Sequence, residues 1–395
     1  MQLRLVKFVD KYAGSFACLV LGSLRSPAML LSGKFNPEKA KKILVIQLWG
    51  VGETITTVPA IKSLRKKFLN SDIEILATAR NKDVYFGNND ITKVIEIEPG
   101  FFQLMKFAKR NFRKYDLIVD MEEYLNASAF VSFFIGRERV GFDHGFRSLM
   151  YTRKTRYNDM HHSVFAFLDL AAKVGGDKKA IALGNLNFSK EDEQEVKNFM
   201  NDKRISKKDF IIGIAPGAAE SAPSRKWPKE RYAKLADSLL RKYKKAKIVF
   251  IGSSDERALV EEIFIVMDTK KRVYDAAGIF TLKQTFAMIK KCSAFIGNDS
   301  GPMHIAAAQG VKTIGLFGPN TPVRWAPFGK GNAFVYIGKN ICDFSPCINT
   351  HKGQVPDCFY RRASLDYQKC MKAIDVDRVM MTFAKLNRKA GKKSK

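Results

Sequence analysis

The sequence predicts two doubly wound α/β domains within one chain of 395 residues. Short apolar runs, typical of buried parallel strands, alternate with longer stretches typical of helices. This alternation occurs twice, on either side of a polar and highly charged segment at residues 189–208. Hydrophobic residues make up 46% of the chain, which is enough for two cores. Ligands bind at the carboxyl ends of the strands in such sheets, so we expect a cleft between the domains to hold the site.

The first domain is expected over residues 41–188, where continuous apolar runs predict buried strands. The predicted strands are 41–48, 73–77, 93–97 and 115–120, and the predicted helices are 54–68, 101–112 and 162–174. The basic segment 137–158 is predicted to be an irregular loop at the rim of the site.

The second domain is expected over residues 209–340, after a linker with a helix at 189–208. Its predicted strands are 210–214, 247–251, 272–274, 293–296 and 313–317. A tail at 341–395, which contains four cysteines, is expected to end in a helix.

The turn at residues 297–301 carries the most chemical information in the second domain. It joins a short strand to a small-residue helix, in which Pro302 suits the first turn and Ser300 or Asp299 can serve as the cap. The N–H groups and the dipole of such a helix end attract an anion. The carboxylate of Asp299 repels phosphate but accepts hydrogen bonds from sugar hydroxyls. The turn therefore suits a ligand with both phosphate and sugar, although an ordinary capped turn is the alternative.

The net charge restricts the partners of the chain. Lys and Arg number 68 against 39 Asp and Glu, which gives a formal charge of +29. Such a chain favours nucleic acid, acidic lipid or phosphorylated substrates. No helix-turn-helix, zinc-finger or RNA-binding motif is present, so a membrane surface or an anionic substrate is preferred over specific nucleic-acid binding.

Residues 1–40 are expected to form a segment at the membrane interface. An apolar side with nearby cations predicts a helix that lies on anionic headgroups; the alternative is a helix packed on the protein itself. The apolar residues are Leu3, Leu5, Val6, Phe8 and Val9, and the cations are Arg4, Lys7 and Lys11.

The glycine turn after the first strand argues against a dinucleotide cofactor. Gly50 and Gly52 match the start of the Rossmann fingerprint, but Ile55 occupies the position of the third glycine. No acidic residue follows the second strand to bind a ribose. Glu53, in the first turn of the next helix, either complements the helix dipole or takes a proton from a hydroxyl at the cleft floor.

Two strand ends of the second domain carry further polar groups. The strand at 210–214 is followed by Ser221, Ser224, Arg225 and Lys226, whose hydroxyls and cations suit a diphosphate, although a solvated basic loop is the alternative. Glu256 follows the strand at 247–251 and either holds ribose hydroxyls or caps a helix.

Several stretches resemble glycosyltransferase family 9, the ADP-heptose:lipopolysaccharide heptosyltransferases. They are residues 210–228, residues 296–310 with Asn-Asp-Ser-Gly-Pro-Met-His at 298–304, and residues 315–329. Residues 42–68, with Thr-x-Pro-Ala-x-x-x-Leu at 57–64, are similar to the family's first strand, turn and helix. The resemblance covers roughly residues 41–385, and the 298–304 motif is its most specific part.

The resemblance implies a two-domain GT-B fold and metal-independent transfer with inversion from a nucleotide-sugar donor. The donor would bind the C-terminal domain. Lys226 would bind the donor phosphates, Glu256 the ribose or base, and Asp299 the transferred sugar. Ser300 and Gly301 would offer N–H groups to the diphosphate. Glu53 stands where the family usually has Asp as the general base. Ser224 and His304 are expected near the diphosphate, where His304 either adds charge or packs locally.

The function expected from this resemblance is heptosyl transfer from a nucleotide-diphosphate donor, ADP-heptose, to a lipid-linked acceptor of the lipopolysaccharide type. The first domain would serve the acceptor, no cofactor is implied, and the chain would work at the cytoplasmic face of the inner membrane. The alternatives are a GT-B nucleotide-sugar epimerase and a non-catalytic basic membrane-binding protein.

The four tail cysteines are spaced more loosely than the paired C-x2-C units of a zinc ribbon. Cys342, Cys347, Cys358 and Cys370 could hold a structural metal, stay reduced, or form disulfides in an exported chain. Reduced or metal-bound thiols are preferred, because nucleotide sugars are cytosolic.

Overall fold

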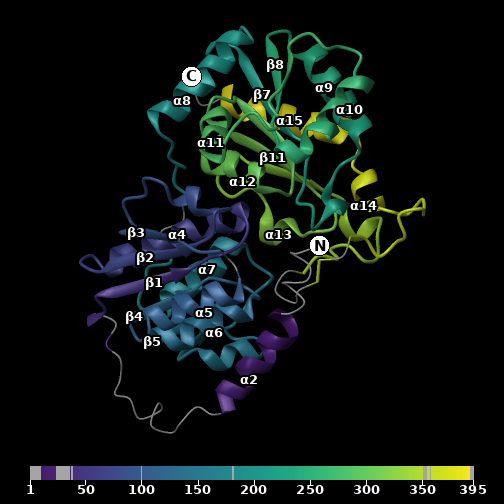
Figure 1. The fold of residues 1–395 in the computed structure, drawn as a ribbon. Helices are drawn as coiled ribbons and strands as arrows, with labels where there is room; N and C mark the ends of the chain where they lie inside the picture. The colour runs from purple at the N-terminus through teal and green to yellow at the C-terminus, as the bar shows by residue number, and fades with distance from the viewer. Residues whose placement is uncertain are drawn as a thin grey trace. The chain divides into compact units, whose positions relative to one another are not determined.

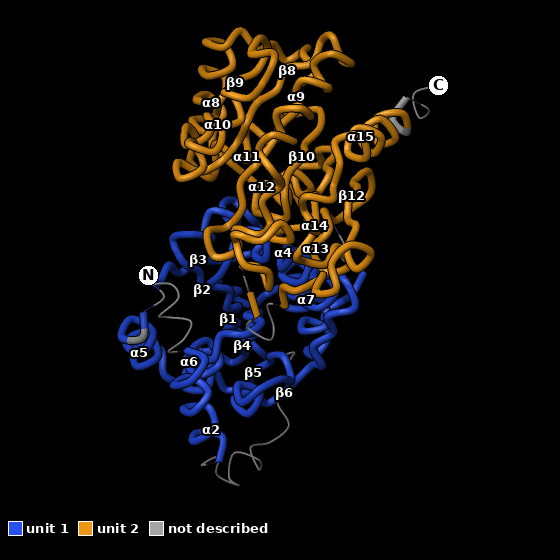
Figure 2. The backbone as a smooth tube through the Cα atoms, turned by 90° about the vertical axis from the view of Figure 1, so that its right-hand side faces the viewer, with its two compact units in different colours: residues 1–182 blue, residues 183–395 orange. Residues whose placement is uncertain are grey.

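Two six-stranded sheets, each flanked by helices, form the core of the structure (Figure 1). The structure is a computed structural model that describes residues 10–23, 36, 39–98, 100–179, 182–349, 354–355 and 357–391. The chain divides into unit 1, Met1–Ala182, and unit 2, Leu183–Lys395, which Figure 2 colours separately. All strand pairs in both sheets are parallel, as the alternation of strands and helices predicts.

Unit 1 has the strand order β3-β2-β1-β4-β5-β6, which is that of a doubly wound fold. The strands are β1 (Lys42–Ile46), β2 (Asp72–Ala77), β3 (Lys93–Glu96), β4 (Tyr115–Asp120), β5 (Gly136–Phe142) and β6 (Arg153–Thr155). The helices are α2 (Ser15–Ser23), α4 (Val51–Lys67), α5 (Phe101–Arg110), α6 (Asn126–Ile135) and α7 (Ser163–Ala172), with shorter turns η1 (Asp10–Gly14), η3 (Lys82–Tyr85) and η4 (Phe146–Met150). The four strands predicted for this domain are therefore confirmed.

The sheet of unit 1 is buried on both faces. Successive side chains of a strand point to opposite faces. Leu44 and Ile46 of β1 join an apolar cluster with Leu104 of α5. Ile43 and Val45, which point the other way, are equally inaccessible to solvent. Helix α5 packs against α6, and α4 packs against α7. This double cover explains why the strands read as continuous apolar runs rather than as alternating ones.

Unit 2 repeats the same winding, with the strand order β12-β11-β10-β7-β8-β9. The strands are β7 (Phe210–Ala215), β8 (Ala246–Phe250), β9 (Val273–Asp275), β10 (Ala294–Asn298), β11 (Lys312–Phe317) and β12 (Ala333–Tyr336). The helices are α8 (Lys190–Asp202), α9 (Lys229–Lys242), α10 (Arg257–Val266), α11 (Leu282–Lys290), α12 (Gly301–Ala308), α13 (Pro322–Trp325), α14 (Lys369–Lys372) and α15 (Val376–Gly391), with shorter turns η5 (Pro223–Arg225), η6 (Ser254–Glu256) and η7 (Gly338–Asn340). The five strands predicted for this domain are confirmed, whereas β12 was not predicted.

The segment expected to link the domains, residues 189–208, contains α8, which packs against α11 of unit 2. The Ser189 hydroxyl accepts the Asp192 backbone N–H at 3.1 Å and begins the helix. Phe199 is buried, and Lys291 forms an ion pair of 2.6 Å with Glu193. At the other end of the unit, α15 packs against α9 and β12. The C-terminal helix is therefore part of the core of unit 2.

The prediction of an irregular loop at residues 137–158 is wrong. Strands β5 and β6 and the turn η4 occupy most of this segment. Its charged residues obscured the strand pattern, yet Arg139 is only 1% exposed. The guanidinium of Arg139 donates hydrogen bonds to the backbone carbonyls of Met150 at 2.6 Å and of Gly136 and Arg137 at 3.0 Å each. These carbonyls satisfy the buried charge, so a strand can contain it.

The N-terminal segment is described from Asp10 to Ser23, where η1 leads into α2. The apolar residues proposed to lie on a membrane, from Leu3 to Val9, fall outside the described residues. Within the part of the chain that the structure describes, no helix is long and apolar enough to cross a bilayer.

Candidate functional site

Both sheets have a point where the winding reverses, and all the predicted site residues except Glu256 follow the strands that meet there. In unit 1, β1 and β4 are neighbours at this reversal; in unit 2, the corresponding pair is β7 and β10. Loops leave such a strand pair in opposite directions and open a crevice at the carboxyl ends. Glu53 follows β1, Lys226 follows β7 and Asp299 follows β10. The fold therefore brings the predicted residues of each unit to the binding edge of its own sheet.

The side chain of Asn298 joins the two loops at the reversal of unit 2. It is fully buried at the end of β10. Its Nδ2 donates to the backbone carbonyls of Pro216 at 2.7 Å and Gly217 at 3.1 Å. Its Oδ1 accepts the Trp227 backbone N–H at 3.2 Å and the Tyr232 hydroxyl at 2.9 Å. Since all these groups are buried, the loop that carries Lys226 has a fixed position beside Asp299.

Asp299 is held by two neighbouring loops and is 3% exposed. Its Oδ2 accepts a hydrogen bond of 2.7 Å from Nδ2 of Asn320, which follows β11. The same oxygen lies 3.4 Å from a guanidinium nitrogen of Arg225. The sequence predicted Arg225 as one of the loop cations that suit a diphosphate, not as a partner of Asp299, and it assigned no role to Asn320, which lies in the Gly-Pro-Asn-Thr-Pro stretch at 318–322. The loop that carries Asp299 and the two loops that carry Arg225 and Asn320 thus meet at one carboxylate and fix its direction.

The N-terminus of α12 lies next to Asp299. Ser300 is the N-cap, but its side chain makes no capping hydrogen bond, so the predicted side-chain cap is absent. The first N–H groups of a helix have no acceptor within the helix. The amides of Ser300 and Gly301 lie at this helix end, and their binding of an anion stays a prediction.

His304 is buried within α12 and packs edge-to-face on Trp325, with ring centroids 6.2 Å apart. Burial, together with the charge of Arg225, lowers the pKa of His304 to about 4. The imidazole is neutral at neutral pH. Of the two interpretations of His304, the structure favours local packing over a cation near the diphosphate.

Glu256 lies against two glycines at the ends of β7 and β8. A Cβ on Gly217 would come 1.7 Å from a carboxyl oxygen of Glu256, and one on Gly252 would come within 2.6 Å. The carboxylate accepts the Ser253 backbone N–H at 2.9 Å. Burial raises the pKa of Glu256, and the charge of Lys226 lowers it. The charge of Lys226 therefore acts on the carboxylate of Glu256.

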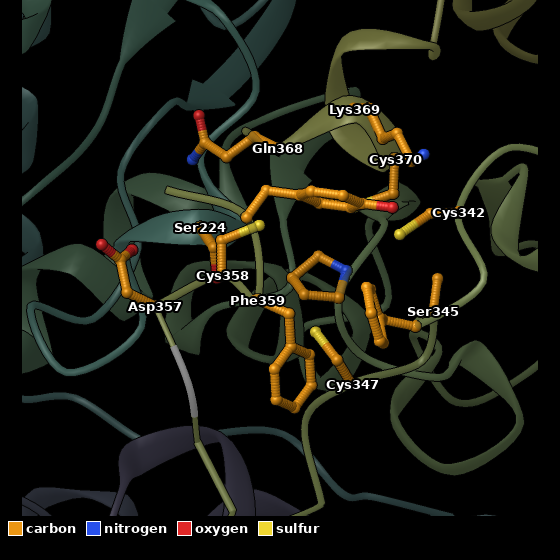
Figure 3. A pocket seen from close by; sticks show the side chains of 13 residues that line it. Ser224, Cys342, Ser345, Cys347, Asp357, Cys358, Phe359, Gln368, Lys369 and Cys370 are labelled. Carbon is orange, nitrogen blue, oxygen red and sulfur yellow. The ribbon is translucent and has the colours of Figure 1, made fainter. Parts of the chain in front are cut away.

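Ser224 lies in a different environment from the other predicted donor residues. It lines a cavity of about 10 Å³, together with all four tail cysteines (Figure 3). Its hydroxyl is buried and forms no hydrogen bond in the described part of the chain. The structure therefore places Ser224 on the loop after β7, against the cysteine tail.

The four cysteines Cys342, Cys347, Cys358 and Cys370 come together around this cavity as free thiols. Burial, together with the neighbouring thiols, raises the pKa of Cys370 to about 12 and that of Cys347 to about 11. Among the described residues, no group of three or more His, Cys, Asp or Glu side chains is arranged to hold a metal ion. The structure thus gives the thiols a common location but no metal-ligand geometry.

In unit 1, Glu53 lies in the first turn of α4 and is half-buried. Its Oε2 accepts the Gly50 backbone N–H at 3.3 Å. Glu122, which follows β4, is 2% exposed and accepts the backbone N–H of Leu48. Burial raises the pKa of Glu122 well above its usual range, and the charge of Glu53 raises it further. The reversal of unit 1 therefore carries two neighbouring carboxyl groups.

A buried polar network supports this edge of unit 1. Arg147 is 1% exposed and donates to Asp120 Oδ2 at 3.1 Å and to the backbone carbonyl of Glu122. Asp120 Oδ2 also accepts the Tyr151 hydroxyl at 2.6 Å and the Ser128 hydroxyl at 2.8 Å. This oxygen is fully engaged, so Asp120 is a structural carboxylate and Glu53 is the accessible one.

Comparison with solved structures shows that this chain has the GT-B fold. Solved structures of similar fold include the glycosyl transferase family 9 protein from Veillonella parvula, with a TM-score of 0.74 at 21% identity over 88% of this chain and 97% of that chain. The ADP-heptose lps heptosyltransferase II of E. coli has a TM-score of 0.68 at 21% identity, covering 89% of this chain and 99% of that chain.

The family model for glycosyltransferase family 9 (heptosyltransferase) matches residues 104–350, so the chain belongs to that family. The lipooligosaccharide heptosyltransferase 2 of Haemophilus ducreyi is 28% identical over 308 residues, or 73% of this chain and 86% of the relative. The protein of the same name from Haemophilus influenzae is 27% identical over 302 residues, or 72% of this chain and 85% of the relative. The chain is thus a glycosyltransferase.

Proposed function

We infer that this glycosyltransferase moves a heptose, with inversion, from ADP-heptose to a lipid-linked saccharide of the lipopolysaccharide type, at the cytoplasmic face of the inner membrane. The relatives described above are named as heptosyltransferases of lipooligosaccharide or lipopolysaccharide. The basic charge of +29 suits both a phosphorylated donor and an acceptor in an anionic membrane.

The observation that carries this proposal is the arrangement of groups on the binding edge of unit 2. Asp299 offers a directed carboxylate for sugar hydroxyls, beside the amides at the start of α12. Lys226 and Glu256 lie on the loops after the neighbouring strands β7 and β8, where a cation serves phosphate and a carboxylate serves ribose hydroxyls. A nucleotide diphosphate sugar contains each of the partners that these groups prefer.

In the proposed reaction, Glu53 of unit 1 takes the proton from the acceptor hydroxyl. The hydroxyl oxygen forms a bond to the anomeric carbon of heptose while the bond from that carbon to the diphosphate breaks. Lys226 and the N–H groups at Ser300 and Gly301 stabilise the negative charge that develops on the leaving diphosphate. A single displacement of this kind inverts the anomeric configuration.

A thermal-shift comparison of donors tests the proposed donor directly. We expect ADP-heptose to raise the melting temperature more than UDP- or GDP-sugars at equal concentration, because ligands stabilise the state that they bind. A larger shift with a UDP- or GDP-sugar would contradict the assignment of ADP-heptose. Consumption of the donor without an acceptor would favour an epimerase, and binding without transfer to any cell-envelope extract would favour a non-catalytic protein.

The Asp299→Ala variant should lose affinity for the sugar nucleotide and keep its affinity for the free nucleotide. Charge-assisted hydrogen bonds contribute about 1.5–3 kcal/mol each, so the loss should be roughly tenfold or more. Binding of ADP should stay unchanged or become tighter, because the substitution frees Arg225 from its carboxylate partner. Titration calorimetry with ADP-heptose and ADP measures both.

Two comparison variants make the Asp299 result specific. Asp202→Ala removes an exposed carboxylate from the end of α8 and should change neither affinity. Lys226→Ala should weaken both ligands, because Lys226 is assigned to the phosphates that they share. Equal losses of both ligands in Asp299→Ala would show that Asp299 does not bind the sugar.

A further inference from the structure

The N-terminal elements η1 and α2 are attached to unit 1 by specific contacts. The carboxylate of Asp10 accepts the backbone N–H groups of Asn126 at 3.0 Å and Ala127 at 2.8 Å, and so caps the start of α6. The Asn126 side chain returns a hydrogen bond of 3.0 Å to the Asp10 carbonyl. Cys18 is fully buried in a cluster with Ala129 of α6. One face of this segment is therefore fixed on the domain.

Glycine allows this close approach at two positions. A Cβ on Gly14 would lie 2.9 Å from the Cβ of Asn126, and a Cβ on Gly22 would lie 2.7 Å from the side chain of Leu149. On the inner face of the segment, these two glycines therefore allow the close packing of η1 and α2 against α6 and η4.

The outer face of η1 and α2 is apolar and exposed. Tyr12 is 58% exposed, Phe16 67%, Leu19 40% and Val20 38%. These positions are spaced i, i+4, i+7 and i+8, which puts them on one side of a helix. Single exposed apolar residues are ordinary, but a stripe of four indicates an interaction surface.

Helix α5 adds cations to the same part of unit 1. Both α2 and α5 pack against α6, which lies between them in Figures 1 and 2. Lys106, Lys109 and Arg110 of α5 are exposed, and Phe102 is 82% exposed. Neither α2 nor α5 contains an acidic residue. The surface therefore combines insertable apolar groups with positive charge.

We propose that the outer faces of η1, α2 and α5 form one docking surface for an anionic lipid bilayer. An interfacial helix buries its apolar side in the headgroup region, while cations attract the anionic lipids. Tyr12, Phe16, Leu19 and Val20 supply the apolar side, and Lys11 and the three α5 cations supply the charge. This cationic rim argues for anionic lipid rather than for a second copy of the same positively charged chain.

The docking surface is connected to the proposed catalytic edge of unit 1. The charge of Arg147 acts on Asp10, which caps α6 from the docking segment. Arg147 also donates to the backbone of Glu122, which neighbours Glu53. The use of the docking surface in catalysis rests on the proposed function. Docking through η1, α2 and α5 holds Glu53 near a bilayer that contains a lipid-linked acceptor. Lipid binding itself does not depend on the sugar chemistry.

Vesicle sedimentation of the full chain tests the proposal. Binding should be strong to phosphatidylcholine vesicles that contain phosphatidylglycerol, weak to phosphatidylcholine alone, and weaker at high salt because the charge is screened. Two variants each remove one part of the surface: Lys106→Gln/Lys109→Gln/Arg110→Gln, and Phe16→Gln/Leu19→Gln. Each should reduce the partition coefficient for anionic vesicles by roughly tenfold or more, given the contribution of each buried apolar group and each cation.

Controls of equal chemical change lie in unit 2. Lys203→Gln/Lys207→Gln/Lys208→Gln removes three exposed cations, and Ile265→Gln/Val266→Gln removes two exposed apolar side chains of α10. Both control variants should bind vesicles like the unaltered chain.

Equal losses in the control and surface variants would overturn the proposal, as would equal binding to neutral and anionic vesicles. A dimer in light scattering that only Phe16→Gln/Leu19→Gln dissociates would instead assign the stripe to a second copy. Failure of vesicle binding with intact heptosyl transfer to a soluble acceptor would reject the docking surface alone.

Discussion

Glu53→Gln is expected to lower turnover by at least ~100-fold, while donor affinity stays nearly unchanged. Glutamine keeps the shape of the side chain and can still meet the Gly50 N–H, but it cannot take a proton from the acceptor hydroxyl. A base acts in the transition state, so its removal should appear in kcat and not in the donor dissociation constant. Steady-state kinetics together with donor titration separates the two.

Two further variants sharpen the test of Glu53. Glu53→Asp should retain measurable activity, because aspartate keeps a carboxylate that can take the proton and is shorter by only one methylene. Glu230→Gln changes an exposed glutamate in the first turn of α9 and should leave turnover unchanged. Wild-type transfer by Glu53→Gln would reduce Glu53 to a helix-dipole residue. Glu122 would then be the next candidate, since Asp120 is enclosed by Arg147, Tyr151 and Ser128.

Arg147→Met is expected to lower the free energy of unfolding by about 3–5 kcal/mol, because removal of one partner leaves a buried charge without compensation. Asp120 would lose its ion pair, and the carbonyl of Glu122 would lose its donor. Urea denaturation followed by circular dichroism measures the loss. The effect should exceed those of ordinary surface substitutions, which stay within about 0.5 kcal/mol.

Arg137→Met provides the matched control for Arg147, because Arg137 is an exposed arginine of the adjoining strand β5. The double variant Asp120→Asn/Arg147→Met should lose less stability than the two single variants added together, since it removes both members of the pair. If Arg147→Met and Arg137→Met were equally stable, the buried network would not support the edge of unit 1.

The sequence was sufficient to predict both doubly wound sheets, because strands covered on two faces leave long apolar runs such as Ile43–Ile46. It did not predict β5, since the run Arg137-Glu138-Arg139 resembles a solvated loop. The burial of Arg139 depends on the carbonyls of Gly136, Arg137 and Met150, and Met150 takes its place only after the chain has folded. The spacing of apolar residues in the sequence does not indicate that backbone carbonyls will accept hydrogen bonds from a buried guanidinium.

The candidate site was predictable where one short motif contains the chemistry, as in the turn with Asp299, Ser300 and Gly301. Pairings between distant loops were not predictable. Asn320 lies 21 residues from Asp299 in sequence, and Arg225 lies 74 residues from it, yet both contact its carboxylate side chain or backbone. The packing of His304 on Trp325 likewise emerged only from the fold.

The measurement that tests the proposed transfer most directly is product analysis after incubation with isotopically labelled ADP-heptose and a lipopolysaccharide core acceptor. Mass spectrometry detects the mass of one added heptose, and NMR assigns the anomeric configuration of the new bond. We predict label in the acceptor only when acceptor is present, with the configuration opposite to that of the donor. Label that remains in an altered nucleotide sugar, or a new bond with the donor's configuration, would contradict the proposed inverting heptosyl transfer.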